Sequence, residues 1–352
     1  MLSRSASLDI LSGRRRGIVA ACLRGTLAAA EPLYGWFIRR RNGRYNRGAL
    51  PITRVEAPVI SVGNLTVGGT GKTPLVCWLA KWFQSRGIPV TLISRGYGKS
   101  QGPNDEALEL EAKLPSVPHL QNPDRVAAAA QSLAKNPRQI LILDDAFQHR
   151  RIARDLDIVL LDALEPFGYG RLLPRGLLRE PVEGLARAHV VGLSRADAIV
   201  PSRREQIRQE VARRAPQAAW LKLTHRPAGW INASGQKLPL EALRGEGVLA
   251  FCGIGNPAGL AHSLWSAGVK TVALREFPDH HAYTNRDFTE LGDWCSRQSA
   301  AAAIVCTHKD LVKIPRERMG TLPLWALAVE MEISAGGERL QSYLEELAAR
   351  VR

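Results

Sequence analysis

The chain has 352 residues, of which 45% are hydrophobic and 23% charged, and its formal net charge at pH 7 is +15. This composition predicts a folded protein long enough for two domains and excludes an intrinsically disordered chain. The five cysteines include no C-x-x-C pair, and no H-E-x-x-H motif or Cys/His cluster is present. The sequence therefore argues against a disulfide framework and against a transition-metal site.

Positive charge is concentrated at the amino terminus, where residues 1–54 contain eleven arginines and only two acidic residues. Such an end can bind nucleic acid, an anionic membrane surface or an acidic substrate. Within it, Arg14–Arg16 and Arg39–Arg41 flank an apolar stretch that Arg24 and Glu31 interrupt. A transmembrane helix needs about 20 uninterrupted apolar residues. The pattern therefore argues against a membrane-spanning helix.

The same stretch predicts two amphipathic helices separated at Pro32, because a proline ends one helix and can start the next. Arg24 and Glu31 share one helical face, which leaves apolar side chains on the others. Trp36 and Phe37 stand beside three arginines, which is typical of a membrane interface. We expect the helix pair to lie on the cytoplasmic leaflet of a membrane. The alternative is a packed helical hairpin with a solvated basic face.

Residues 59–73, VISVGNLTVGGTGKT, predict a buried strand, a glycine-rich loop and the start of a helix. This is the context of a phosphate-binding P-loop, whose backbone N–H groups and helix N-terminus hold phosphate oxygens. We expect Lys72 to reach the terminal phosphates and the Thr73 hydroxyl to bind Mg²⁺. Thr66 replaces the usual first glycine of the pattern. The predicted nucleotide-binding residues are Thr66, Val67, Gly68, Gly69, Thr70, Gly71, Lys72 and Thr73.

Strand and helix patterns alternate after the P-loop. A helix is predicted over 74–86, a strand over 90–94, a helix over 124–134 and a strand over 139–145, with a polar loop between the first strand and the second helix. This alternation predicts an α/β fold of the P-loop NTPase type, in which helices cover both faces of a parallel sheet.

Two strands of this pattern end in aspartates that could hold Mg²⁺. The first ends in Asp144 and Asp145, and the second, DIVLLD at 157–162, ends in Asp162. A Walker B strand delivers such a carboxylate to the ion opposite the P-loop threonine. We favour Asp144 and Asp145, because two adjacent carboxylates are costly without a cation. The sequence leaves open which strand lies beside the P-loop strand.

The second half of the chain predicts a smaller α/β domain without a P-loop. A β-hairpin with strands at 220–223 and 229–232 is expected to link it to the first domain, and we expect it to close over and position the substrate. The predicted organisation is interfacial helices at 1–50 as part of the first domain, a P-loop domain at 51–219, a β linker at 220–240 and the smaller domain at 241–352.

The sequence resembles one family, the tetraacyldisaccharide 4′-kinases of lipid A biosynthesis. The segments that carry the resemblance are SVGNLTVGGTGKTP (61–74), SRGYG (94–98), DE (105–106), DD-x-F-Q-H (144–149), FGYGRLLPRGLLREP (167–181), FPDHHAYT (277–284) and KDLVKI (309–314). Thr66 fits the resemblance, because the family's loop resembles TVGGTGKT. Two local departures are Asn104-Asp105-Glu106-Ala107, where the family commonly has GDEP, and His308-Lys309-Asp310, where it has EKD.

The resemblance implies ATP- and Mg²⁺-dependent phosphorylation of the 4′-hydroxyl of an acylated glucosamine disaccharide that already carries one phosphate. It implies that Asp105 is the base near the acceptor hydroxyl and that His280 orients or tunes it, as an Asp–His pair formed across two domains. Glu180 is a further candidate Mg²⁺ ligand. The residues expected to contact phosphate or sugar are Arg95, Tyr97, Arg125 and Gln148.

A lipid acceptor gives the basic, apolar amino terminus a physical reason, because acyl chains would meet apolar faces and arginines would meet phosphates. We expect a peripheral protein on the cytoplasmic face of the inner membrane. Its expected partners are the lipid substrate and the anionic membrane surface, with no nucleic acid and no protein partner.

Two other classes are less consistent with the sequence. A P-loop GTPase or metallochaperone would need an N/T-K-x-D run, and Thr307-His308-Lys309-Asp310 has these letters in the wrong order. A basic nucleic-acid-binding ATPase would place its charge on a polar recognition element. Here the charge stands beside apolar and aromatic residues.

Overall fold

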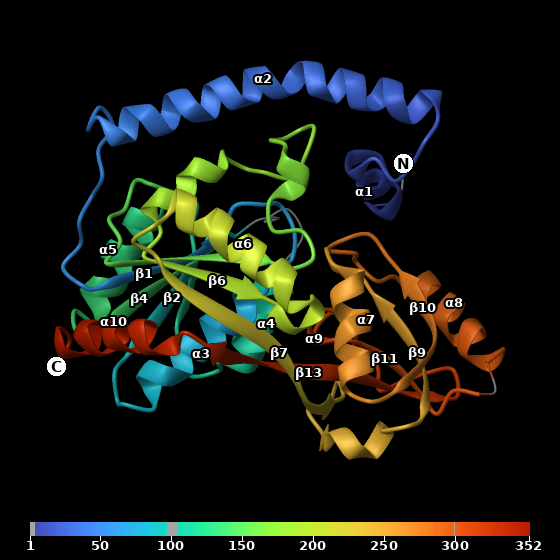
Figure 1. Ribbon diagram of the computed structural model, residues 1–352. Coiled ribbons are helices and arrows are strands. Elements are labelled where there is room, and N and C mark those ends of the chain that lie inside the picture. The colour runs from blue at the N-terminus through green and yellow to red at the C-terminus, as the bar shows by residue number, and fades with distance from the viewer. Residues whose placement is uncertain (1–3, 97–104, 299) are drawn as a thin grey trace. The chain divides into compact units, whose positions relative to one another are not determined.

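The computed structural model describes residues 4–96, 105–298 and 300–352 (Figure 1). These residues form two compact units. Unit 1 contains the described residues within 1–97, 114–224 and 333–352, and unit 2 contains those within 98–113 and 225–332. The chain therefore passes between the units four times.

A parallel sheet with the strand order β7-β6-β5-β1-β4-β2-β3 forms the core of unit 1. Every residue of the four strands β6, β5, β1 and β4 is buried, which is the pattern of strands covered by helices on both faces. The predicted parallel α/β fold is confirmed. The strands are β1 (Val59–Asn64), β2 (Val90–Ser94), β3 (His119–Gln121), β4 (Ile140–Asp144), β5 (Leu156–Asp162), β6 (Val190–Ser194) and β7 (Ala219–Ile231).

In unit 1, helices follow strands along the chain: α3 follows β1 and the P-loop, and α5 follows β3. Helix α3 starts at the last residues of the P-loop and buries Leu75, Leu79 and Phe83. It packs against β1 and β4, so the P-loop rests on the middle of the sheet. The helices of unit 1 that follow β1 in the chain are α3 (Lys72–Gln84), α5 (Arg125–Lys135), α6 (Pro201–Arg214) and α10 (Gly337–Ala349), with the short 3-10 helices η1 (Gly168–Gly170), η2 (Val182–Arg187) and η3 (Ala196–Ala198).

Two helices precede the sheet, α1 (Arg4–Ser12) and the long α2 (Ile18–Asn46) (Figure 1). The break between them contains Gly13 and Gly17, whose φ angles of +81° and +113° suit glycine. Among the helices of the described part of the chain, none combines the length and the hydropathy needed to cross a membrane.

Helix α2 continues through Pro32, so the predicted helix break at this residue is wrong. Contacts on both sides of the proline hold the helix in one piece. The Glu31 carboxylate accepts a hydrogen bond from the Leu172 N–H (2.9 Å), and the Tyr34 hydroxyl donates to the Arg179 carbonyl oxygen (2.7 Å). These tertiary contacts outweigh the local preference of proline.

Unit 2 is built on four parallel strands in the order β10-β9-β11-β13. Its strands are β9 (Gly247–Cys252), β10 (Lys270–Glu276), β11 (Ala303–Thr307) and β13 (Leu322–Ala335), with β12 (Arg318–Met319) antiparallel to β13 and β8 (Lys237–Leu238) antiparallel to the end of β7. Its helices are α4 (Asp105–Lys113), α7 (Pro257–Ser266), α8 (Asn285–Ser296), α9 (His308–Leu311) and the short η4 (Leu240–Leu243).

The hairpin predicted at the start of the second half has its turn in a different place. Strand β7 continues to Ile231, and Trp230 pairs with Leu238 across the real turn. The Asn232 side chain stabilises this turn, because its oxygen accepts hydrogen bonds from the Gln236 N–H and the Ser234 hydroxyl. The predicted turn at 224–228 is therefore wrong.

The boundaries of the compact units also differ from the predicted domains. Residues 333–352, predicted in the smaller domain, belong to unit 1, and 98–113, predicted in the kinase domain, belong to unit 2. Residues 105–113 form helix α4, where a loop was predicted, and this helix packs against α9. Contacts between segments distant in the chain produce both differences.

Candidate active site

Strand β1, which leads into the P-loop, lies between both strands that end in candidate metal ligands. Val62 of β1 pairs with Asp144 of β4 on one side and with Ile158 of β5 on the other. The strand order therefore places Asp144 and Asp162 at the same edge of the sheet as the P-loop. The hydrogen-bond and ion-pair partners of these aspartate side chains show what each of them does in the protein.

Asp162 at the end of β5 is paired with a buried arginine. Arg195 Nη2 lies 2.6 Å from Asp162 Oδ2 and donates a second hydrogen bond to the Gly69 carbonyl oxygen, also at 2.6 Å. The Asp162–Arg195 pair thus braces the P-loop from the β5 side. Asp144 and Asp145, at the end of the strand on the other side of β1, stay the predicted metal ligands.

The P-loop has backbone angles that require glycine at two positions. Gly68 and Gly71 have φ angles of +128° and +85°, and Gly71 directly precedes helix α3. Thr66, at the position where other P-loops have glycine, pairs with Leu178 in a short antiparallel bridge. The Val67 N–H also donates to the Leu177 carbonyl oxygen at 2.8 Å. Loop 167–181 therefore forms one wall of the P-loop.

Asp145 contacts two cations. Its carboxylate lies 3.5 Å from Lys72 Nζ and accepts hydrogen bonds of 2.7 and 2.9 Å from Arg179 Nη1. Burial raises the pKa of Asp145, but Lys72 and Arg179 outweigh burial and hold this pKa at about 2. The carboxylate is ionised at neutral pH and stands next to the first residue of α3.

Glu180, predicted as a further metal ligand, is completely buried and has protein partners on both oxygens. Arg187 Nη2 lies 3.0 and 2.9 Å from the two oxygens, and the amides of Gln148 and Asn42 each donate at 3.0 Å. These contacts join α2, η2 and the segment after β4. They favour a role for Glu180 in holding the site together.

A cavity of about 450 Å³ opens beside the P-loop on the β4 side. Four arginines line it, and three of the predicted substrate contacts, Arg95, Arg125 and Gln148, are among its lining residues. Tyr97, the fourth, lies outside the residues that the structure describes. The full lining is Tyr34, Ile38, Arg41, Val67, Arg95, Pro123, Arg125, Asp145, Gln148, His149, Leu173 and Arg179.

Several of these lining residues were not predicted from the sequence, although signals for them were present. Tyr34, Ile38 and Arg41 are spaced four and three residues apart, so they share one face of α2. Arg179 and His149 stand within the LREP and DD-x-F-Q-H runs beside residues that were selected. In each case only the three-dimensional fold shows which face points into the cavity.

The charge of the cavity suits a phosphate-bearing ligand. Guanidinium groups bind phosphate oxygens through paired hydrogen bonds, so four of them around one cavity favour an anionic occupant. Burial lowers the pKa of His149 to about 4, and the nearby positive charges of Arg125, Arg154 and Arg151 lower it further in the same direction. His149 is therefore neutral at pH 7.

The two residues predicted to act on the acceptor hydroxyl both belong to unit 2, so the expected pairing across two domains is wrong. Asp105 starts helix α4, and its side chain lies outside the described part of the chain. His280 has a φ of +60°, and its N–H donates to the Gly253 carbonyl oxygen at 3.1 Å. Asp105 belongs to the same unit as His280 because its helix, α4, packs against α9, which starts at His308.

Asp310 anchors the segment that contains His280. It is fully buried, and its Oδ1 accepts hydrogen bonds from the Gly253 N–H (3.1 Å) and the Tyr283 hydroxyl (3.0 Å). Its Oδ2 accepts a hydrogen bond of 2.6 Å from the Thr307 hydroxyl. The KDLVKI run therefore fixes the position of the FPDHHAYT run.

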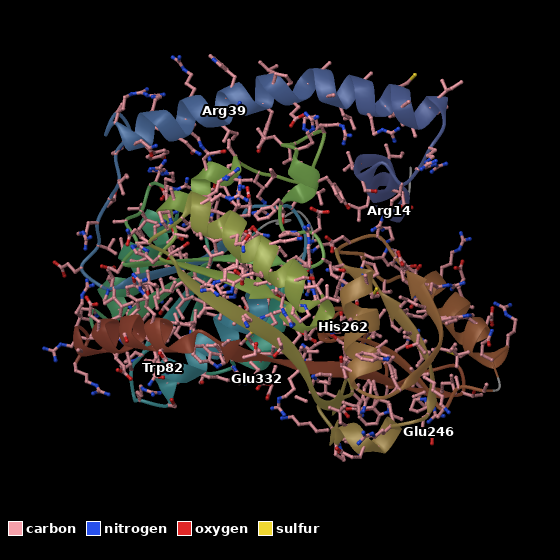
Figure 2. The ribbon with its side chains drawn as sticks, viewed as in Figure 1. Arg14, Arg39, Trp82, Glu246, His262 and Glu332 are labelled. Carbon is pink, nitrogen blue, oxygen red and sulfur yellow. The ribbon has the colours of Figure 1, made fainter. Side chains whose placement is uncertain are left out.

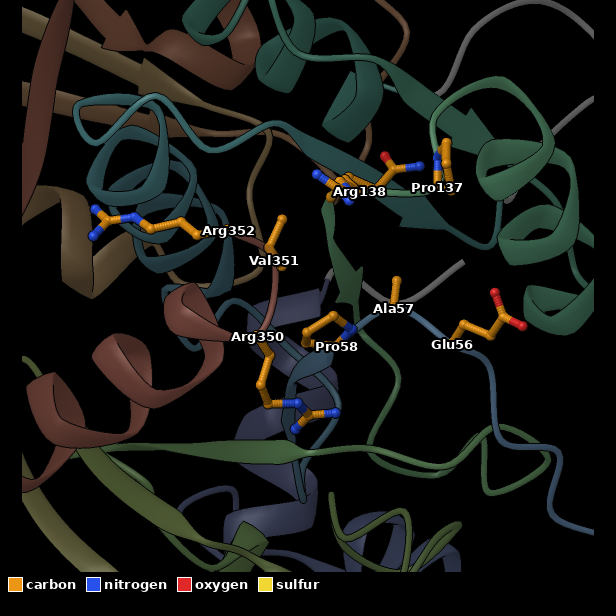
Figure 3. A pocket seen from close by; sticks show the side chains of 9 residues that line it. Glu56, Ala57, Pro58, Pro137, Arg138, Arg350, Val351 and Arg352 are labelled. Atoms are coloured by element: carbon orange, nitrogen blue, oxygen red, sulfur yellow. The ribbon is translucent and has the colours of Figure 1, made fainter.

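A second, smaller pocket of about 170 Å³ lies elsewhere in unit 1 (Figure 3). It is lined by Ala57 and Pro58, which precede β1, and by Arg138, which precedes β4. The P-loop follows the opposite, carboxyl end of β1, where ligands of such sheets bind. This pocket is therefore separate from the nucleotide site.

The residues around the P-loop suit magnesium better than other metals. Within residues 4–96, 105–298 and 300–352, no group of three or more His, Cys, Asp or Glu side chains could hold a metal by itself. Nucleotide-bound Mg²⁺ needs only one or two protein carboxylates or hydroxyls, since phosphates and water complete its shell. Thr73, Asp144 and Asp145 supply such oxygens next to the P-loop.

The central P-loop strand, the acidic end of the next strand and the cavity for an anionic ligand together define a nucleotide-dependent kinase of the P-loop class. Comparison with known proteins shows which family of P-loop kinases this is. The family model for tetraacyldisaccharide-1-P 4′-kinase matches residues 23–349, and the chain belongs to this family.

Individual relatives agree with the family model. The tetraacyldisaccharide 4′-kinase of Anaeromyxobacter sp. (strain Fw109-5) is 36% identical, over 96% of this chain and 95% of its own. That of Geobacter sulfurreducens is also 36% identical, over 92% and 93% of the two chains. A crystal structure of LpxK from Aquifex aeolicus in complex with ATP matches with a TM-score of 0.71 and 29% identity, covering 92% of this chain and 99% of that one.

Proposed function

We propose that this protein transfers the γ-phosphate of ATP to the 4′-hydroxyl of a tetraacyldisaccharide 1-phosphate, the precursor of lipid A. The observation that carries the proposal is the arginine-lined cavity of about 450 Å³ directly beside the P-loop, with Asp145 and Val67 in its wall. A phosphorylated sugar bound there would present a hydroxyl next to the terminal phosphate of the nucleotide. The names of the relatives describe the same reaction.

The donor phosphates would be held by the P-loop. Its backbone N–H groups and the N-terminus of α3 stabilise the phosphate charge, and Lys72 would reach the β- and γ-phosphates. Bound Mg²⁺ would offset the negative charge of the transferring phosphoryl group, and we propose Thr73, Asp144 and Asp145 as its protein ligands. Arg179 binds Asp145 and lines the cavity, so it links the metal side of the site to the acceptor side.

For the acceptor, we propose Asp105 as the general base and His280 as the residue that orients it. The proton of the 4′-hydroxyl would pass to the Asp105 carboxylate while the oxygen attacks the γ-phosphorus and ADP leaves. The surroundings of α9 support the pairing. Lys309 Nζ lies 3.9 Å from Asp279, beside His280, and α9 also packs against the helix that Asp105 starts.

We also propose that α2 binds the cytoplasmic face of the inner membrane. Leu33, Trp36 and Phe37 are each more than half exposed on this helix. Exposed arginines stand next to them, and Figure 2 labels Arg39 on α2 and Arg14 before it. Apolar and aromatic side chains interleaved with arginines suit an anionic lipid surface.

Phosphate transfer from γ-labelled ATP to purified tetraacyldisaccharide 1-phosphate tests the function. We expect the protein to form the labelled 1,4′-bisphosphate, and Asp105→Asn to lower the rate by about two to four orders of magnitude while ATP binding persists. Glu111→Gln, on the same helix, is the matched control and should keep the full rate. Absence of transfer by the unaltered protein would refute the activity, and a fully active Asp105→Asn variant would refute the base.

A further inference from the structure

A buried arginine contacts the turn at 145–149, which directly follows β4. The Arg154 side chain is only 9% exposed. Its Nη2 donates to the Ala146 and His149 carbonyl oxygens, each at 2.6 Å, and to the Phe147 carbonyl oxygen at 3.3 Å. The carboxylate that pairs with this arginine is farther away, with 3.8 Å between Arg154 Nη1 and Asp157 Oδ2. The closest partners of the buried charge are therefore the carbonyl groups of one turn.

A charge in this position is costly for the fold. Burial lowers the pKa of Arg154, the Asp157 carboxylate raises it, and the positive charge of Arg187 lowers it again. An apolar side chain of similar size would avoid the cost of burying a charge, but the Phe147 and His149 carbonyl groups would lose a donor. What the guanidinium supplies in return is a single backbone conformation for the turn.

The same turn provides side chains to the arginine-lined cavity. Asp145, Gln148 and His149 all line it. His149 Nε2 is buried and has no hydrogen-bond partner within the described part of the chain, so it is available to a ligand. The Gln148 amide donates to the Asn64 carbonyl oxygen at 2.9 Å, where β1 enters the P-loop. One backbone conformation therefore sets the positions of three cavity side chains relative to the P-loop.

We propose that Arg154 is a positioning residue for the acceptor. By holding the carbonyl groups of the turn, it keeps Gln148 and His149 in place to bind the phosphorylated sugar and keeps Asp145 beside the P-loop. Arg154 is not among the lining residues of the cavity, so it acts through the turn and not by contact with the substrate. The inference deepens the proposed function and rests on it in one respect, namely that the cavity binds the acceptor.

Separate measurements on the two substrates of the complete protein test the inference. In Arg154→Met an apolar side chain fills the space while the carbonyl groups lose their donor. We expect its affinity for ATP, measured by titration calorimetry without lipid, to stay within about threefold of the unaltered protein, because the P-loop amides remain. Its KM for the acceptor should rise about tenfold or more and its kcat should fall by about ten- to a hundredfold, because small displacements of positioning groups are that costly.

Two controls separate positioning from stability and from charge. Leu344→Ala removes a fully buried side chain of α10 in unit 1. It should lower the urea midpoint and leave the KM values of both substrates unchanged. Arg151→Met removes a positive charge that acts on His149, from a side chain that is 54% exposed and pairs with Asp124. It should also leave the KM for the acceptor unchanged.

Arg154→Lys keeps the charge near Asp157 but has a shorter side chain without the guanidinium fork. We expect this variant to fold and to raise the KM for the acceptor by about threefold or more, less than Arg154→Met does. It decides the question if Arg154→Met does not fold, because an unchanged KM for the acceptor in Arg154→Lys would then overturn the inference.

Three further results would overturn the inference. They are normal acceptor kinetics of Arg154→Met, equal losses of ATP and acceptor affinity in that variant, and an equal rise of the acceptor KM in Leu344→Ala or Arg151→Met. Failure of the unaltered protein to transfer phosphate would refute the proposed function separately. The affinity for the acceptor in detergent micelles, measured by calorimetry without ATP, would then still compare Arg154→Met with the unaltered protein, and equal affinities would overturn the role of Arg154.

Discussion

Lys72 links the nucleotide to the acidic end of β4. Its ammonium lies 3.5 Å from Asp145, and phosphates at the P-loop would attract the same ammonium. Phosphate binding would therefore draw Lys72 away from Asp145 and make that carboxylate more available to Mg²⁺. Arg179 would remain as the second cation on Asp145.

Replacement of Lys72 tests this link. We expect Lys72→Ala to lower the rate of phosphate transfer by about three orders of magnitude or more, because the charge on the terminal phosphates loses its main protein partner. The pKa of Asp145 should rise from about 2 toward its usual 3.8, since the largest favourable charge is lost. Lys81→Ala, on the exposed side of the same helix, is the control for the transfer assay. Normal transfer by Lys72→Ala would contradict the assigned role.

Gly63, near the end of β1, packs so closely against Phe147 that no side chain fits at this position. A Cβ atom at this position would lie 2.6 Å from the Phe147 Cβ and 2.8 Å from the Phe147 backbone nitrogen. Neither neighbour can move freely, because Phe147 is completely buried in the core of unit 1. The close approach of these two segments brings the DD-x-F-Q-H run against the P-loop strand.

We expect Gly63→Ala to lower the free energy of unfolding by about 2 kcal/mol or more, the cost typical of overpacking a rigid core. Urea denaturation measures the change. Gly25→Ala is the control, because a Cβ at Gly25 in α2 would meet no atom within 4 Å. That substitution should be neutral or raise stability by up to about 1 kcal/mol. Equal stability of the two variants would show that Phe147 can yield.

At the level of elements, α2 serves two surfaces at once. Its inner face supplies Tyr34, Ile38 and Arg41 to the arginine-lined cavity. Its outer face exposes Trp36 and Phe37. Lipid held by the outer face would therefore lie only one helix width from the cavity, about 10 Å. This arrangement suits a substrate whose acyl chains stay in the membrane while its sugar enters the site.

We expect simultaneous replacement of Leu33, Trp36 and Phe37 by serine to abolish most co-sedimentation with vesicles containing anionic lipid, because the apolar contact area is lost. Transfer to a water-soluble, short-chain acceptor should persist, since none of the three residues lines the cavity. Ile52→Ser, which removes an exposed apolar side chain outside α2, is the control. Unchanged vesicle binding by the triple variant would refute the membrane surface.

Elements with a strong local pattern could be predicted from the sequence. Strand β2 was predicted with its observed bounds, Val90–Ser94, because apolar β-branched residues between turn signals define such a strand. Elements decided by distant contacts could not be predicted. Contacts with loop 167–181 keep α2 continuous at Pro32, and α4 packs against α9, which is nearly two hundred residues away in the chain.

On the scale of the whole molecule, the site also has parts that a local sequence pattern reveals and parts that only distant contacts assemble. The P-loop and the aspartates after β4 carry their chemistry in a short run of residues, so sequence reasoning finds them. The arginine-lined cavity assembles Arg41, Arg95, Arg125 and Arg179 from four separate segments. No spacing in the chain relates these four residues, and they come together only through the strand order and the contacts of α2 with loop 167–181.

Both units contain a partly buried histidine whose protonation opposes folding. In unit 1, burial lowers the pKa of His149 to about 4, with further lowering by Arg125, Arg154 and Arg151 against Asp124. In unit 2, burial lowers the pKa of His308 to about 4, with Lys113 lowering and Glu109 raising it. Each histidine has an ordinary pKa of about 6.5 in the unfolded chain.

Between pH 6.5 and pH 4 the unfolded chain therefore binds more protons than the folded protein, so the free energy of unfolding falls as the pH is lowered through this window. Asp145 adds a separate loss at lower pH. Its pKa is lowered from 3.8 to about 2, so the stability it contributes is lost only as the pH falls through that interval.

Urea denaturation at a series of pH values from 7.5 to 4 measures this slope. We expect His149→Gln and His308→Gln each to flatten the decline, and the double variant to flatten it most, because an amide takes up no proton in this range. Because the histidines stand in different units, their effects on the slope should add. A double variant that loses stability as steeply as the unaltered protein would show that other groups take up the protons.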